Sequence, residues 1–171
     1  MKKTIYVPLA VDVLHSAHVN LLKIASKYGY VIVGLLTDKA ISEYKRIPML
    51  NFQERYKIVS SLKFVDQIVE QDQWDYTINI KKYKPNYFLH GDDWKKGIQK
   101  TLRKKVTKTL KDINCKLIEI PYTKNISSSE IKSKIEKAGI NSENRISILK
   151  RLMSSKPIVK VLESHNSLTG L

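Results

Sequence analysis

Two histidines three residues apart, His15 and His18, stand where the chain leaves its first apolar segment and enters a helical pattern. In an open α/β sheet, ligands bind beyond the carboxyl ends of the strands, where a helix amino terminus offers free N–H groups to phosphates. Imidazoles at such a turn can donate hydrogen bonds to phosphate oxygens while charge develops during group transfer. Surface or capping histidines are the alternative, and no Cys/His cluster supports a metal site.

A second polar segment, Gly91-Asp92-Asp93-Trp94, follows another short apolar run. A carboxylate at this position can accept a hydrogen bond from the amino group of a base, and Trp94 can pack on a ring. An ordinary turn between a strand and a helix, with an aspartate as the N-cap, is the alternative.

Hydroxyls and cations complete the candidate set. Ser127 and Ser128, after Ile126, would suit phosphate oxygens, although they can equally be helix caps. Lys45 and Arg55 can neutralise a triphosphate. The basic run at 95–111 is expected to be the outer face of a helix, because it lacks the interleaved aromatic residues that stack on nucleic-acid bases.

Alternating apolar segments indicate which elements position these residues. We expect five strands, at 4–9, 30–36, 65–69, 87–90 and 116–120. We expect helices between and after them, at 18–28, 51–62, 78–83, 97–112 and 127–138. Such alternation predicts an α/β fold with a parallel sheet of about five strands and helices on both faces. From about residue 142 the chain is expected to form a helical appendage.

Length and composition fit one globular domain of 171 residues. Cys115 is the single cysteine, so no intramolecular disulfide is expected. Neither a signal peptide nor an apolar run of about 20 residues is recognisable, so we expect a cytoplasmic protein that does not bind membranes. The formal charge of +15, from 31 basic and 16 acidic residues, attracts polyanions without identifying one.

Taken in order, the three polar segments resemble motifs of the cytidylyltransferases, a family of the His-x-Gly-His nucleotidyltransferases. The resemblance covers about residues 3–138 and implies a Rossmann-like fold. It also implies transfer of CMP from CTP with release of pyrophosphate. Three positions depart from the family pattern: Ala17 replaces the usual glycine, and Tyr122 and Asn125 replace an arginine and a glycine.

The resemblance implies a role for each candidate residue. His15 and His18 would be catalytic together with Lys45 and Arg55. The acceptor would be held by Lys45, Arg55 and Trp74. The nucleotide would be bound by Ala10, Asp12, Gly91, Asp92, Asp93, Trp94, Ile126, Ser127 and Ser128. Mg²⁺ would be held mainly by CTP, with no metal ligand predicted from the protein, and a homodimer is expected from the resemblance.

The last residues, 155–171, resemble the beginning of a phosphoenolpyruvate mutase. This implies a cytidylyltransferase domain at 1–140 and a linker with a helical tail at 141–171, to which a mutase barrel is joined in a longer chain. It also implies a phosphonate acceptor, such as 2-aminoethylphosphonate or 2-hydroxyethylphosphonate. Because all the motifs precede Gly139, we expect the tail to be dispensable for transfer.

Three other functions remain open. The acceptor can be glycerol-3-phosphate or another phosphomonoester, and a transferase of this fold can use ATP. A non-catalytic nucleic-acid-binding domain is a third possibility. It would bind in a strongly salt-dependent manner, but it leaves the ordered motifs unexplained. We therefore expect CTP and a small acceptor as partners, and no nucleic acid.

Overall fold

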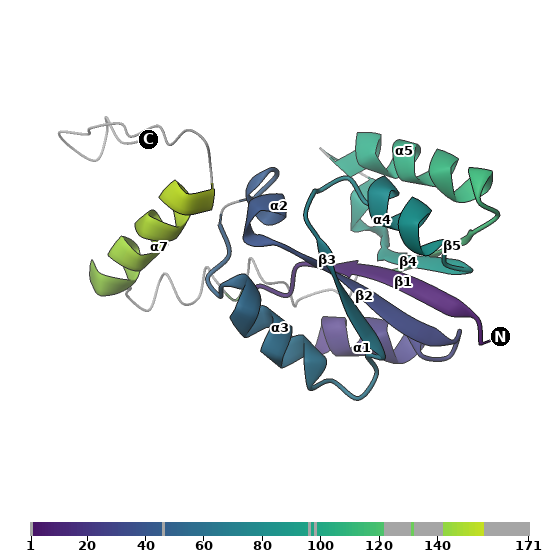
Figure 1. The fold of residues 1–171 in the computed structure, drawn as a ribbon, viewed down its shortest axis with the longest axis horizontal. Helices are drawn as coiled ribbons and strands as arrows, with labels where there is room; N and C mark the ends of the chain where they lie inside the picture. The colour runs from purple at the N-terminus through teal and green to yellow at the C-terminus, as the bar shows by residue number, and fades with distance from the viewer. Residues whose placement is uncertain are drawn as a thin grey trace.

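A computed structural model describes residues 2–45, 47–95, 97, 99–121, 131 and 142–155. Five strands form one parallel sheet in the order β3-β2-β1-β4-β5 (Figure 1). The strands are β1 (Thr4–Leu9), β2 (Tyr30–Leu36), β3 (Gln67–Gln71), β4 (Tyr87–Gly91) and β5 (Lys116–Ile120). The described helices are α1 (Ser16–Ala25), α2 (Asp38–Ser42), α3 (Phe52–Ser60), α4 (Thr77–Tyr83), the 3₁₀ helix η1 (Asp92–Lys95), α5 (Gln99–Asp112) and α7 (Ser142–Ser155). The expected Rossmann-like α/β fold is confirmed.

Helices cover both faces of the sheet, with α1 and α3 on one face and α4 and α5 on the other (Figure 1). Ile5, Val7 and Leu9 alternate along β1 and are buried with Leu22 of α1 on the first face. Tyr6 points to the opposite face and is buried in the second core. The near-continuous apolar runs in β1 and β2 follow from this burial on both faces.

On the face of the sheet that carries the second core, Gly34 leaves space for the buried side chain of Tyr6. The Tyr6 hydroxyl donates to Gln71 Oε1 at 2.7 Å and accepts from Asn79 Nδ2 at 2.9 Å. A Cβ at Gly34 would lie 1.9 Å from that hydroxyl oxygen. The close approach explains a glycine inside an otherwise bulky strand.

Several element boundaries differ from the sequence prediction. Helix α1 begins at Ser16 instead of residue 18, and β3 begins at Gln67 instead of residue 65. The short helix α2 was not expected; Thr37 starts it by accepting a hydrogen bond from Ala40 N–H at 3.2 Å. The helix predicted at 127–138 lies outside the described residues except for residue 131. Among the described helices, none is long and apolar enough to cross a membrane.

The order of the strands determines where a ligand can bind. Strand β1 pairs with β2 on one side and with β4 on the other, so the chain changes direction across the sheet at β1. Connections leaving the carboxyl ends of two such strands diverge and leave a crevice between them. The turns after β1 and β4 are therefore brought together.

Candidate active site

A cavity of about 520 Å³ lies at the carboxyl ends of β1 and β4. Its volume is in the range of small-molecule sites. The described lining residues are Pro8, Leu9, Ala10, Val11, His15, Ala17, His18, Asn20, Leu21, Lys23, Ile24, Lys27, Leu36, Tyr44, Lys45, Tyr76, His90, Gly91, Asp93, Gln99, Ile120 and Pro121. Six residues predicted for the site line this cavity, namely Ala10, His15, His18, Lys45, Gly91 and Asp93.

The two histidines are in contact at the start of α1. His15 is the N-cap residue, and its ring centroid lies 3.9 Å from that of His18. His18 Nδ1 accepts a hydrogen bond from the backbone N–H of His15 at 3.4 Å. Because Nδ1 is the acceptor, a neutral His18 carries its proton on Nε2. Nε2–H is then the group of His18 that remains to donate to a ligand.

Both imidazole rings have a pKa below the usual value for histidine, which favours their neutral form. Burial lowers the pKa of His15. Burial also lowers the pKa of His18 to about 3, with smaller contributions from His15 and from the Lys45 ammonium. Neutral imidazoles avoid the cost of bringing more positive charge beside Lys45 and can still donate hydrogen bonds.

The turn after β4 contributes Gly91 and Asp93 to the cavity, together with a histidine that the prediction left out. His90 lines the cavity, and its Nδ1 lies 2.8 Å from the Gly91 carbonyl oxygen, which requires the proton on Nδ1. Its ring stacks on Trp94, with centroids 4.0 Å apart. Burial lowers its pKa, although Gly91 and Asp93 act in the opposite direction.

The predicted contact between Trp94 and a base or ribose is wrong, because its indole is fully buried. Trp94 Nε1 donates to Glu119 Oε1 at 2.8 Å, and Arg103 Nε donates to the same oxygen at 2.8 Å. Trp94 thus supports His90 from behind. Asp92, also predicted to bind the nucleotide, does not line the cavity.

Arg55 was predicted to hold phosphate, and its position contradicts this. The side chain is fully buried, and Nη1 donates to the carbonyl oxygens of Ala10 and Leu36, each at 2.7 Å. Nη2 donates to Asp38 Oδ1 at 2.7 Å, and Nε to the Leu50 carbonyl oxygen at 3.2 Å. Arg55 therefore joins the ends of β1 and β2 to their neighbouring loops instead of facing a ligand.

Asp12 likewise has a structural position. Its Oδ1 accepts from the N–H of Met49 at 2.5 Å and of Leu50 at 3.4 Å, and the residue is buried. It does not line the cavity. Asp12 was predicted to bind the nucleotide, but in the structure its carboxylate holds the loop before α3.

Two tyrosines missed by the sequence prediction form one wall. Tyr44 and Tyr76 line the cavity, whereas Trp74 lies behind, stacked on Tyr44 with centroids 4.9 Å apart. Trp74 was predicted to contact the acceptor, but Tyr44 and not Trp74 lines the cavity. Burial raises the pKa of Tyr44 to about 12, helped by the nearby Asp93 carboxylate. The sequence offered one indication of these two residues, since Tyr44 directly precedes Lys45 and Tyr76 follows two residues after Trp74.

Some predicted groups lie beyond what can be described. Ile126, Ser127 and Ser128 are outside the described residues. No group of three or more metal-ligating side chains occurs in the described part of the chain. Asp93 is the one carboxylate among the described lining residues. If CTP carries an Mg²⁺ ion into this cavity, Asp93 is the described carboxylate that would reach the ion.

Fold and site together are those of a Rossmann-like nucleotidyltransferase, with two histidines in contact at the first strand–helix turn. A model of the cytidylyltransferase-like family matches residues 11–134, and the chain belongs to this family. It is thus a CTP-dependent nucleotidyltransferase.

Named relatives agree with this assignment. The chain is 31% identical over 123 residues to the glycerol-3-phosphate cytidylyltransferase of Bacillus spizizenii, covering 71% of this chain and 88% of that protein. It is 36% identical over 84 residues to the ethanolamine-phosphate cytidylyltransferase of Mus musculus, covering 48% of this chain and only 21% of that protein. The fold also matches the lipopolysaccharide core biosynthesis protein from Thermoplasma volcanium, with TM-score 0.61, 24% identity, and coverage of 72% and 99% of the two chains.

Proposed function

We propose that the protein transfers CMP from CTP to a small acceptor that carries a phosphate or phosphonate group. The carrying observation is the grouping of two neutral imidazoles, His15 and His18, with the ammonium of Lys45 on one cavity. An acceptor oxygen attacks the α-phosphorus of CTP, the bond to the bridging oxygen breaks, and pyrophosphate leaves on the opposite side. Positioning and charge stabilisation suffice for this step, so no nucleophilic side chain is needed.

In this mechanism His18 and Lys45 contact different oxygen atoms. Nε2–H of His18 donates to the α-phosphate or the bridging oxygen as negative charge develops there. Lys45 holds the oxygens of the acceptor. Bound Mg²⁺ supplies charge neutralisation for the triphosphate.

The relatives favour a phosphomonoester, because their names specify glycerol-3-phosphate and ethanolamine-phosphate. The residues of the cavity wall favour an acceptor of the ethanolamine-phosphate type. Tyr44, Tyr76 and Asp93 combine aromatic rings with a carboxylate, and such surroundings suit a cationic amine. An amine-bearing acceptor is therefore preferred over glycerol-3-phosphate in our proposal.

A phosphonate is the second candidate, and residues 155–171 are the observation that favours it. Their resemblance to the beginning of a phosphoenolpyruvate mutase links the chain to carbon–phosphorus chemistry. These residues, apart from residue 155, lie outside the described part of the chain.

A panel of four acceptors tests two properties of the acceptor: amine against hydroxyl, and phosphate against phosphonate. Pyrophosphate release from CTP is measured with ethanolamine-phosphate, glycerol-3-phosphate, 2-aminoethylphosphonate and 2-hydroxyethylphosphonate. We expect higher kcat/KM for each amine than for the hydroxyl compound of its pair. The comparison of the phosphate pair with the phosphonate pair decides between the two candidates. Release with none of the four, or equal use of ATP, contradicts the proposed function.

A further inference from the structure

A side chain from the far end of the described chain reaches the loops behind the active site. Arg151 of α7 donates from Nη1 to the carbonyl oxygen of Met49 and from Nη2 to Asp38 Oδ2 at 3.2 Å. The side chains of Arg151 and Asp38 are each only about one-fifth exposed, at 21% and 22%. An ion pair this well covered is screened less by solvent than a surface pair.

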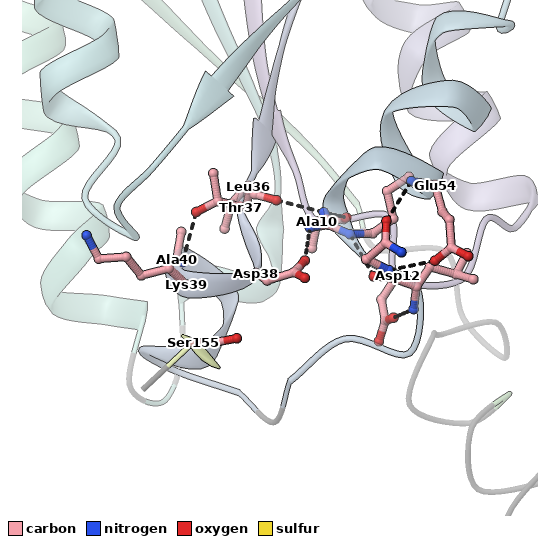
Figure 2. A network of polar contacts seen from close by, with 12 residues as sticks. Ala10, Asp12, Leu36, Thr37, Asp38, Lys39, Ala40, Glu54 and Ser155 are labelled. Carbon is pink, nitrogen blue, oxygen red and sulfur yellow. Dashed lines mark hydrogen bonds and ion pairs between the residues drawn. The ribbon is translucent and has the colours of Figure 1, made fainter. Parts of the chain in front are cut away.

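The carboxylate that receives Arg151 belongs to a larger network. Asp38 Oδ1 accepts from Arg55, whose guanidinium also binds the carbonyl oxygens of Ala10 and Leu36. Figure 2 shows three members of this network, Ala10, Leu36 and Asp38, where β1 and β2 end. Ala10 lines the cavity, so the network extends from α7 to the wall of the active site.

Arg151 touches the chain on both sides of Lys45. Asp38 is the first residue of α2, seven positions before Lys45, and Met49 lies four positions after it. Lys45 N–H donates to the Ile41 carbonyl oxygen at 2.9 Å, which ties it to α2. The backbone on the other side is held by Arg151 at Met49.

We propose that Arg151 is a positioning residue for the transfer reaction, holding Asp38 and Met49 so that Lys45 is fixed at the cavity. Helix α7 is then a functional part of the cytidylyltransferase unit. The expectation from the sequence that everything after residue 141 is dispensable is revised accordingly. A planar guanidinium can bind a carboxylate and a carbonyl at once, whereas a lysine ammonium at this distance cannot reproduce that fork.

The test compares Arg151→Ala and Arg151→Lys with Lys150→Ala in the full-length chain. Lys150 is the exposed neighbour on the same helix and controls for loss of one charge from α7. We expect Arg151→Ala to raise KM for the acceptor roughly three- to thirtyfold, the usual range for coupling through a packed network. The change in kcat should be smaller, Arg151→Lys should recover part of the loss, and Lys150→Ala should stay within about twofold of wild type.

Amide hydrogen exchange provides a second readout that does not require turnover. Arg151→Ala should increase exchange at residues 45, 47, 49 and 50 but leave β1 and β4 protected. Unchanged KM together with unchanged exchange in a folded Arg151→Ala protein would overturn the proposal. A lower melting temperature with unchanged KM would also overturn it, since this indicates a purely structural role. The kinetic arm rests on the proposed function. If no acceptor is turned over, exchange at residues 45, 47, 49 and 50 alone decides.

Discussion

At the scale of single residues, the tautomer of His18 connects local structure to chemistry. The N–H of His15 occupies Nδ1, so the proton is on Nε2 and is available to a phosphate. We expect His18→Ala to lower kcat by about 10²–10³-fold, the usual loss for one preorganised donor, with a smaller change in CTP affinity. Pyrophosphate-release kinetics and CTP titration calorimetry measure the two effects.

Histidine-to-glutamine exchange is the matched control for this prediction, because an amide restores a donor without a titratable ring. His18→Gln should lose less activity than His18→Ala. Wild-type kcat in a folded His18→Ala protein would remove this histidine from the mechanism.

The lowered pKa of His18 makes a separate prediction about pH. A pKa of about 3 means that the ring stays neutral from pH 8 down to pH 5 in the free protein. An unfolded chain takes up this proton near pH 6.5, so the stability contributed by His18 is present above pH 6.5 and is lost as the pH falls below it. Nitrogen-detected NMR should show an Nε2–H tautomer throughout pH 5–8. A ring that titrates near pH 6.5 would contradict the proposed neutral donor.

A substitution at Asp93 distinguishes binding of the base from binding of the acceptor. The sequence associated Asp93 with cytosine, whereas in the structure its negative charge raises the pKa of Tyr44 and of Tyr76. If it faces the acceptor, Asp93→Asn should raise KM for an amine acceptor about tenfold, because loss of a charge-assisted contact typically costs about 1.5 kcal/mol. Discrimination between CTP and UTP should not change. A loss of that discrimination with normal acceptor KM would assign Asp93 to the base.

At the scale of elements, the packing of β2 requires a residue without a side chain at position 34. A Cβ at Gly34 would overlap the Tyr6 hydroxyl, which is fixed by Gln71 and Asn79. We expect Gly34→Ala to destabilise the fold by about 1–3 kcal/mol through overpacking, measured by urea denaturation.

A double mutant identifies the cause of that loss. Tyr6→Leu removes the hydroxyl and the ring carbons that would lie 1.9, 2.4 and 2.8 Å from the new Cβ, so part of the cost of Gly34→Ala should disappear when both changes are combined. Gly97→Ala is the control, since its Cβ would meet nothing and only its φ of +67° is unfavourable. Strictly additive effects of the first pair would contradict the steric explanation.

The sequence predicted elements better than it predicted the orientation of side chains. The apolar run of β2 was visible because burial on both faces excludes polar residues, but the five-residue helix α2 is too short for a helical period to appear. His15, His18 and Lys45 were predicted to share a site because they follow strand ends, and all three line the cavity. Arg55 and Trp94 were misassigned because charge and aromaticity do not reveal whether a side chain faces the ligand or supports the residues that do.

For the whole molecule, the formal charge is +15, and CTP, the proposed substrate, is a polyanion. The summed field should raise the local concentration of CTP, and added salt should weaken it as the Debye length falls to about 10 Å at 0.1 M. We expect kcat/KM for CTP to fall several-fold between about 20 and 200 mM salt, at saturating Mg²⁺, with kcat nearly constant.

Distant charges test whether this effect comes from the overall field. Lys104 and Lys108 are exposed on α5 and do not line the cavity. Replacing both with glutamine should reproduce a small part of the salt effect at low ionic strength and have no effect at high ionic strength. If kcat/KM is independent of salt while binding of a DNA duplex falls steeply with it, the basic surface serves nucleic acid instead of CTP. The charge would then belong to a second function, separate from nucleotidyl transfer.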